Sequence, residues 1–277
     1  MIIFHCYELW LCPGLRADRA ELRQYCHDQD QAIIVRPSFR DFCSQSTETM
    51  KFHYTDLETC RETTGVVVVI DVLRAFSNAA YAFSRGAKEI YPVSTVEETL
   101  QFQAETPNSL ACGEVGGLPP EGFDFGNSPT QTKELDLTDK VIVQRTGAGT
   151  QGIVRSVNAE TMLAASFVVA NATVAYIHKL APKAVTFVIT GQYAPGHGDE
   201  DLACAAYLEL LLKSQQPEPA PFVERVFQSR DAIQHLDPKE TGFPLSDLDL
   251  CTHIDVFDFA MLVTKESKRH VMRTVRN

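Results

Sequence analysis

The sequence predicts an α/β protein with three layers: a mostly parallel sheet, helices on both of its faces, and a C-terminal antiparallel hairpin. From residue 50 onward, strand-like apolar runs alternate with helical patterns, which is the arrangement that produces a parallel sheet. Residues 65–71 form an almost continuous β-branched run, as expected of a strand that is buried on both faces. A short polar turn separates the last two apolar runs, 257–265 and 270–275. This pattern predicts a hairpin, which we expect at the edge of the sheet.

The first half of the alternation contains clear signals for where helices begin and end. Phe76, Ala79 and Phe83 have helical spacing, and Gly86 follows as a stop. Ser-Thr-Val-Glu-Glu at 94–98 is typical of a capping box at a helix start. We expect strands at 65–71, 88–93, 109–113 and 140–145, and helices at 75–85, 94–104 and 149–157.

The second half continues the same alternation up to a proline-rich linker at 215–221. Beyond that linker, the apolar spacing predicts further helical stretches before the hairpin. We expect strands at 162–168 and 184–190, and helices at 171–180, 200–213, 222–235 and 246–251.

The first 49 residues differ from the rest of the chain. They show little hydrophobic periodicity, and the polar stretch 44–49 precedes Met50, whose run resembles the first strand of an α/β domain. We therefore expect two parts, an N-terminal appendage at 1–49 and an α/β domain at 50–277. The alternative is that residues 18–28 form a small helical cap. Residues 1–11 lack a basic start and make a poor signal peptide.

Composition excludes several classes of protein. The formal net charge is -11, which argues against a general nucleic-acid or anionic-membrane surface. No run approaches the roughly 18 apolar residues that span a bilayer. The chain has 8 cysteines but no C-x-x-C pair and no Cys/His spacing suited to zinc. We expect a reduced, cytoplasmic protein, and homo-oligomer formation stays open.

A glycine-rich turn joins the strand at 140–145 to the helix that follows it. Glycines between a strand and a helix leave backbone N–H groups pointing outward at the positive helix end, which favours anion binding. Gly147, Gly149 and Gly152 also spell G-x-G-x-x-G, the dinucleotide fingerprint. That fingerprint requires an acidic residue about 20 positions later, at the end of the next strand, and the run 162–170 contains none. A phosphate-like oxyanion is therefore favoured, with a dinucleotide or a purely structural turn as alternatives.

Charged residues follow several of the predicted strands. Ligands of parallel sheets bind beyond the carboxyl ends of the strands, so we expect these side chains to gather there. Carboxylates suit Mg²⁺, and arginine can clamp phosphate oxygens with two parallel bonds. Together they favour metal-assisted hydrolysis of a phosphoester. The candidate metal ligands are Asp71, Glu114 and Asp201, the candidate catalytic residues are Asp71, Glu114 and His197, and the candidate substrate-binding residues are Arg74, Arg145, Thr146, Gly147, Gly149 and Thr150.

Each of these residues also has a structural interpretation. Asp71 could cap the helix that begins near residue 75, and Arg145 could pair with an acid in the next loop. Acids at 199–201 favour a helix start in any case, because they oppose the helix dipole. Other phosphatase signatures are absent, since Leu73 stands where an Asp-x-Asp motif beginning at Asp71 would have its second aspartate, and Cys112 begins no Cys-x5-Arg loop. G-x-S-x-G and Walker A motifs are absent as well.

Several motifs in a fixed order resemble the 2-phosphosulfolactate phosphatase family. They lie at 69–77, 113–114, 122–129, 144–151 and 199–205, and the resemblance runs from about residue 50 to 259. It implies an α/β fold and Mg²⁺-dependent hydrolysis of 2-phospho-3-sulfolactate to 3-sulfolactate and phosphate, an early step toward coenzyme M. Residues 1–49 lie outside the resemblance, which agrees with an appendage.

We therefore expect a Mg²⁺-dependent phosphatase whose partner is a small anionic phosphoester, with no nucleic acid or membrane involved. A non-enzymatic binder of small phosphorylated metabolites would use the same loops and is the main alternative. A dinucleotide-dependent oxidoreductase is the less favoured one.

Overall fold

The computed structural model describes residues 49–191 and 196–276, which belong to one compact unit, Glu48–Asn277. The appendage or helical cap expected at 1–49 lies outside the described residues, apart from residue 49, and remains a prediction. None of the described helices is long and apolar enough to cross a membrane.

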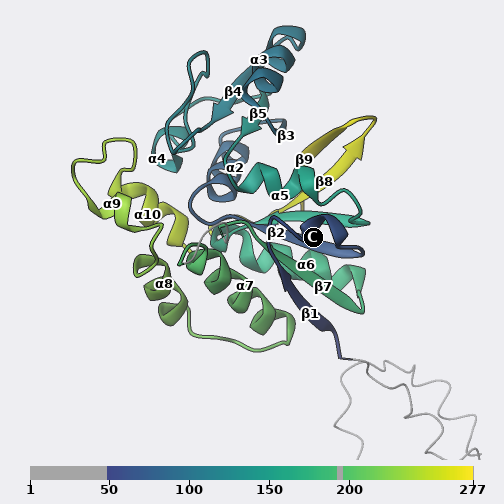
Figure 1. The fold of residues 1–277 in the computed structure, drawn as a ribbon. Helices are drawn as coiled ribbons and strands as arrows, with labels where there is room; N and C mark the ends of the chain where they lie inside the picture. The colour runs from purple at the N-terminus through teal and green to yellow at the C-terminus, as the bar shows by residue number, and fades with distance from the viewer. Residues whose placement is uncertain (1–48, 192–195, 277) are drawn as a thin grey trace, which may run out of the picture. The chain divides into compact units, whose positions relative to one another are not determined.

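Nine strands of the described chain form a single mixed sheet in the order β1-β7-β2-β6-β8-β9-β3-β5-β4 (Figure 1). The strands are β1 (Lys51–Thr55), β2 (Val66–Ile70), β3 (Glu89–Val93), β4 (Ser109–Gly113), β5 (Val141–Arg145), β6 (Thr161–Ala165), β7 (Ala184–Ile189), β8 (Ala260–Glu266) and β9 (Arg269–Val275). The pairings β1-β7-β2-β6 and β3-β5-β4 are parallel, and those of the C-terminal hairpin are antiparallel. The predicted α/β class is confirmed.

The predicted position of the hairpin was wrong. Strands β8 and β9 lie in the middle of the sheet, between β6 and β3, and not at its edge. The physical reason is visible in their side chains, because Met261 and Met272 are fully buried, as central strands require. The hairpin therefore joins the two parallel groups.

The two parallel groups run in opposite directions along the sheet. Three consecutive pairings, β6 with β8, β8 with β9 and β9 with β3, are antiparallel, so the direction reverses three times between the groups. Figure 1 shows β3, β4 and β5 above β1, β2 and β7, with the hairpin beside both. Residues at the carboxyl ends of both groups nevertheless line one pocket, so the two sets of strand ends face each other across it.

Helices cover both faces of the sheet, as predicted. Alternate residues of β2 belong to different cores: Val69 packs in the cluster that contains Phe76, and Ile70 packs in the cluster that contains Leu208. The helices are α2 (Ala75–Ser84), α3 (Val96–Glu105), α4 (Pro129–Thr132), α5 (Gly149–Arg155), α6 (Ala170–Leu180), α7 (Asp199–Leu212), α8 (Ala220–Phe227), α9 (Ile233–Leu236) and α10 (Leu245–Thr252), with short 3-10 turns at Cys60–Glu62 and Phe167–Val169.

Local signals set several of these boundaries. The capping box before α3 forms as predicted, because Thr95 Oγ1 accepts from the Glu98 amide at 3.1 Å and Glu98 Oε2 accepts from the Ser94 amide at 3.0 Å. The single helix expected at 222–235 is instead two helices, α8 and α9. Between them, the Asp231 carboxylate accepts from the backbone of Gly198 at 3.1 Å, which holds this stretch against the start of α7.

Candidate active site

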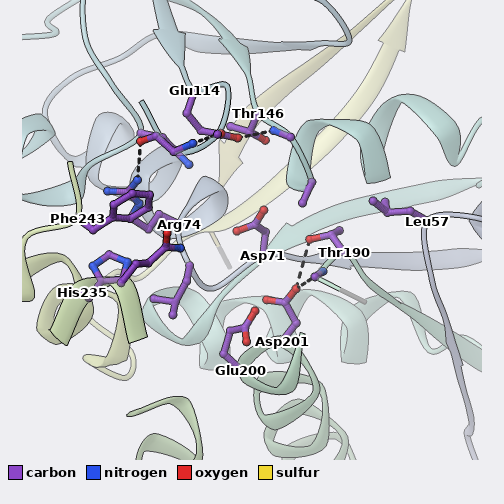
Figure 2. A pocket seen from close by; sticks show the side chains of 18 residues that line it. Leu57, Asp71, Arg74, Glu114, Thr146, Thr190, Glu200, Asp201, His235 and Phe243 are labelled. Carbon is purple, nitrogen blue, oxygen red and sulfur yellow. Dashed lines mark hydrogen bonds between the residues drawn. The ribbon is translucent and has the colours of Figure 1, made fainter. Parts of the chain in front are cut away.

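A pocket of about 420 Å³ lies at the facing strand ends (Figure 2). Its walls come from the loops after β2, β4, β5 and β7, from the first turn of α7, and from the segment that contains α9. Polar and ionisable side chains contribute much of the lining, beside a few apolar ones. The lining includes Asp71, Arg74, Glu114, Asn127, Thr146, Gly147, Thr190, Glu200, Asp201, His235 and Phe243.

Asp71 follows β2 and has two roles in the structure. Its Oδ1 accepts from the Ala75 amide at 2.9 Å at the start of α2, and its carboxyl group also lines the pocket. Burial raises the pKa of Asp71 to about 6; the bond from Ala75 acts in the opposite direction, and repulsion from Glu114 adds to the rise. The helix-capping interpretation and the pocket interpretation therefore both hold for the same side chain.

Gly149 allows the glycine turn to approach Asp71. A Cβ atom at this position would lie 2.6 Å from Asp71 Oδ2 and 2.6 Å from Ala75 Cβ, so any side chain would force α5 away. The glycine is required by this close contact with the carboxyl group. Gly149 itself is buried and is not part of the pocket lining.

Asp201 connects the ends of two neighbouring strands. Its Oδ1 accepts from the Val72 amide at 2.8 Å, and its Oδ2 accepts from the Gly191 amide at 2.9 Å and from Thr190 Oγ1 at 3.3 Å. Complete burial, followed by repulsion from Asp71, raises the pKa of Asp201 well above its usual value. The side chain faces the pocket while it fixes the loops after β2 and β7.

Glu200 was not among the predicted site residues, yet it lines the pocket beside Asp201 (Figure 2). It is 3% exposed, and its Oε2 has no hydrogen-bond partner among the described residues. Burial, followed by repulsion from Asp201, raises its pKa to about 10. The acidic triplet at the start of α7 was the available signal, but the sequence did not show which acids face inward. Asp199 points elsewhere and pairs with Arg225.

The glycine turn does not form the open anion cradle that the sequence suggested. The Gly147 amide donates to Glu114 Oε1, and the Thr146 and Thr150 amides donate to each other's hydroxyl oxygens at 2.9 and 3.0 Å. Glu114 Oε2 also accepts from the Gly117 amide at 2.7 Å. These N–H groups are therefore already bonded within the protein, and Glu114 holds two loops together.

Arg74 is buried at the pocket wall and joins three segments. Its Nη1 donates to Asp247 Oδ2 at 2.7 Å and to the Gly242 carbonyl at 3.0 Å, and its Nη2 donates to the Gly117 carbonyl at 3.0 Å. The guanidinium lies over the Phe243 ring, 4.6 Å from its centroid. Asp247 is fully buried and was missed, because it lies in α10 without a motif around it.

His235, from α9, lies beside Phe243 at the pocket wall (Figure 2). Its Nδ1 donates to the Pro244 carbonyl at 3.1 Å, and burial lowers the pKa of the ring. The sequence analysis did not select His235, since its helix carries no recognisable site pattern.

The remaining candidates lie outside the pocket lining. Arg145 donates through Nη1 to the Glu114 carbonyl at 2.6 Å and through Nε to the Ser94 carbonyl at 3.3 Å, so it supports two loops. His197 Nδ1 lies 2.7 Å from Asp231 Oδ1. The predicted residues that line the pocket are Asp71, Arg74, Glu114, Thr146, Gly147 and Asp201. Those that do not line it are Arg145, Gly149, Thr150 and His197.

The donor set fits a hard cation only in part. Among the described residues, no three His, Cys, Asp or Glu side chains are arranged to hold a metal ion, so Asp71, Glu114 and Asp201 do not form a three-residue cluster. Mg²⁺ commonly takes only one or two carboxylates, and fills its other positions with water and substrate oxygens. The unpartnered oxygen of Glu200 and the raised pKa of Asp71 fit that smaller requirement.

Fold and pocket together define an α/β protein with an acid-lined small-ligand site between two groups of strand ends. The chain belongs to the 2-phosphosulpholactate phosphatase family, whose sequence profile matches residues 52–266. It is 32% identical over 202 residues to a probable 2-phosphosulfolactate phosphatase of Bacillus subtilis (strain 168), covering 73% of this chain and 88% of that protein. It is 33% identical over 199 residues to the protein of the same description from Thermotoga petrophila, covering 69% of this chain and 85% of that one.

Proposed function

We propose that this chain is a Mg²⁺-dependent phosphatase that hydrolyses 2-phospho-3-sulfolactate, or a closely related small phosphoester, to the hydroxy acid and phosphate. The observation that carries the proposal is the pocket itself. It brings together residues from separate family motifs, including Asp71, Glu114, Thr146 and Asp201. Family membership and the names of the relatives support the same activity.

The cation requirement follows from the charge of the pocket. Asp71, Glu200 and Asp201 are buried in the same pocket wall, and burial is the main cause of the raised pKa of each. Repulsion adds to the rise, from Glu114 for Asp71, from Asp201 for Glu200 and from Asp71 for Asp201. Arg74 is the one Lys or Arg among the described lining residues, and it is already paired with Asp247. A phosphate dianion that binds beside these carboxyl groups would be stabilised by additional positive charge, which a bound cation would supply.

Asp71 and Glu200 are the residues that we propose for holding Mg²⁺. When bound, the ion would neutralise phosphoryl oxygens as charge develops on them. Asp201 and Glu114 accept backbone N–H bonds on both of their oxygens, which suits a role in fixing the surrounding loops. This differs from the predicted ligand set of Asp71, Glu114 and Asp201.

The chain's own contribution is positioning. Bonds to Asp201 hold the loops after β2 and β7, and bonds to Glu114 hold the loops after β4 and β5. Phosphoryl transfer depends mainly on such positioning and on charge neutralisation, with little covalent chemistry for the protein to perform. We place the reaction in the cytoplasm and, for the sulfonated substrate, on the route to coenzyme M.

The test is phosphate release from a panel of phosphorylated hydroxy acids, with Mg²⁺ and with EDTA. We expect release in Mg²⁺ with 2-phospho-3-sulfolactate or a close relative, and its loss in EDTA. Saturable ligand binding without any phosphate release would contradict the proposal and would indicate a binder of phosphorylated metabolites. Release that is unchanged in EDTA would remove the metal from the proposal.

A further inference from the structure

His235 lines the pocket and keeps one ring nitrogen without a partner. The side chain is 4% exposed, and its Nδ1 lies 3.1 Å from the Pro244 carbonyl. A carbonyl can only accept, so Nδ1 carries the proton and Nε2 of the neutral ring is a bare acceptor. Pro244 is the one hydrogen-bond partner of the ring among the described residues. Buried polar groups are almost always paired, so this acceptor in a pocket wall indicates a ligand that supplies the donor.

The orientation of the ring is fixed by its surroundings. Its plane lies at 85° to the Phe243 ring, with 5.4 Å between the two centroids. Phe243 packs against Gly117, where a Cβ would lie 1.9 Å from Phe243 Cζ, and the Arg74 guanidinium lies over the ring of Phe243. Figure 2 shows His235 and Phe243 beside each other at one side of the pocket. Nε2 is therefore held in a defined position, as a residue that transfers protons requires.

The ring is suited to take up a proton at neutral pH. Burial lowers the pKa of His235 and Arg74 adds to the lowering, while the bond to the Pro244 carbonyl and the charge of Asp247 act in the opposite direction. The ring is therefore neutral at pH 7, which is the state that a general base needs. An imidazolium formed during a reaction would be stabilised by the same carbonyl and carboxylate groups.

The carboxyl groups of the pocket have other partners or other assignments. Glu114 and Asp201 accept backbone N–H bonds on both of their oxygens. Asp71 and Glu200 are the residues that we assign to the cation. His235 is the remaining side chain of the described lining that can take up a proton at neutral pH.

We propose that His235 is the general base of the reaction: its Nε2 accepts a hydrogen bond from the attacking water and takes that proton as the new O–P bond forms. The other hydrogen of the water stays on the phosphate, and the P–O bond to the leaving group breaks. The departing alkoxide takes a proton from solvent, to which His235 later returns its own. The inference rests on the proposed phosphatase function and adds a catalytic residue to it.

The first test removes Nε2 and keeps the bond to Pro244. In His235→Asn the amide nitrogen takes the place of Nδ1, and nothing replaces Nε2. For an ester that the wild-type protein hydrolyses, we expect kcat/KM to fall by about a hundredfold or more, with little change in melting temperature. The solvent deuterium isotope effect of the wild-type protein should be lost as well. The control is His253→Asn, an exposed histidine outside the pocket lining, which should keep both. An undiminished rate in His235→Asn would overturn the inference.

The second test separates proton transfer from packing. His235→Gly leaves a space at the pocket wall that an added ring can fill. Imidazole is expected to restore the rate of this variant by at least about tenfold, because it supplies a basic nitrogen. Pyrazole has the same ring size but is a far weaker base, and it should restore little. Equal restoration by both rings, or by neither, would count against a general base.

Nitrogen NMR of the ring separates this inference from the proposed activity. Hydrogen phosphate retains one hydrogen of the attacking water, so saturating inorganic phosphate is expected to shift the Nε2 resonance of His235. A resonance that does not respond would overturn the inference, whether or not esters are hydrolysed. If Nε2 responds and no ester is hydrolysed, the phosphatase proposal fails and the contact between His235 and a protonated phosphate stands. If esters are hydrolysed and neither the rate nor the resonance involves His235, the inference fails and the phosphatase proposal stands.

Discussion

The glycine turn after β5 and the first turn of α7 face the same pocket with opposite chemistry. In the turn, the amides of Thr146, Gly147 and Thr150 are bonded by nearby side chains. At the start of α7, Glu200 and Asp201 are buried carboxyl groups without a cation beside them. The amides of the region that resembles an anion site already have partners. At the acidic helix start, Asp201 accepts hydrogen bonds on both oxygens, but Glu200 Oε2 has no partner among the described residues.

The difference shows that the groups left for a ligand in this pocket are identified by their missing partners and not by the glycine-rich motif. A buried carboxylate is costly unless it is paired, and these acids respond with raised pKa values. Buried polar groups without partners are common at functional sites, where a ligand supplies the missing contact. Glycines, by contrast, can be required for packing alone, as Gly149 is against Asp71.

Replacing Asp71 gives the largest expected effect. Asp71→Asn removes the charge that we assign to Mg²⁺ binding, and we expect Mg²⁺-dependent phosphate release to fall by on the order of a hundredfold or more. The melting temperature should change little, because asparagine can still accept from the Ala75 amide. The matched control is Asp199→Asn, an acid in the same first turn as Glu200 but paired with Arg225, and it should retain activity. Comparable losses in both variants would show that the effect of Asp71→Asn does not depend on its place in the pocket lining.

The pH dependence of stability tests the acidic wall in EDTA-treated protein. The pKa of Glu200 is raised from 4.5 to about 10, so the folded state binds more protons than the unfolded state between these values. The contribution of Glu200 to stability is therefore present below pH 4.5 and is lost as the pH rises toward 10. We expect Glu200→Gln to remove a slope of up to about 1.4 kcal/mol per pH unit in denaturant melts. Parallel wild-type and variant curves across this range would show that the carboxyl group is not desolvated as described.

Most strands and helices were predicted from the sequence, because the buried apolar residues recur with the spacing of a strand or of a helix. The β-branched run of β2 and the helical spacing of α2 predicted their elements closely. The central position of the hairpin was not predicted, since strand order depends on contacts between distant segments. Ala260 and Met261 carried the available signal, because these neighbouring apolar residues of β8 pack in two different cores, one on each face.

The site was predicted in part, and the limits have a physical cause. Asp71, Glu114 and Asp201 follow strands or begin a helix, so topology alone placed them near the pocket. Whether a side chain turns inward depends on its partners, which the sequence does not show for Glu200 and Arg145. Asn127 lies in a family-like motif, but only the structure shows that it lines the pocket.

Arg145→Lys gives the smallest expected effect and tests the glycine turn after β5. Arg145 donates to the carbonyls of Glu114 and Ser94, outside the pocket lining, so lysine would lose one of these contacts. We expect stability to fall by about 1 kcal/mol, and inorganic phosphate affinity to change by less than about twofold. The control is Arg85→Lys, which removes a similar guanidinium bond to the Leu135 carbonyl, a group that belongs neither to the glycine turn nor to the pocket lining. If calorimetry instead showed phosphate binding weakened by about tenfold in Arg145→Lys alone, Arg145 would have to turn into the pocket when ligand binds. The glycine turn would then be an anion site that opens on binding. Its difference from the first turn of α7 would hold only before the ligand binds.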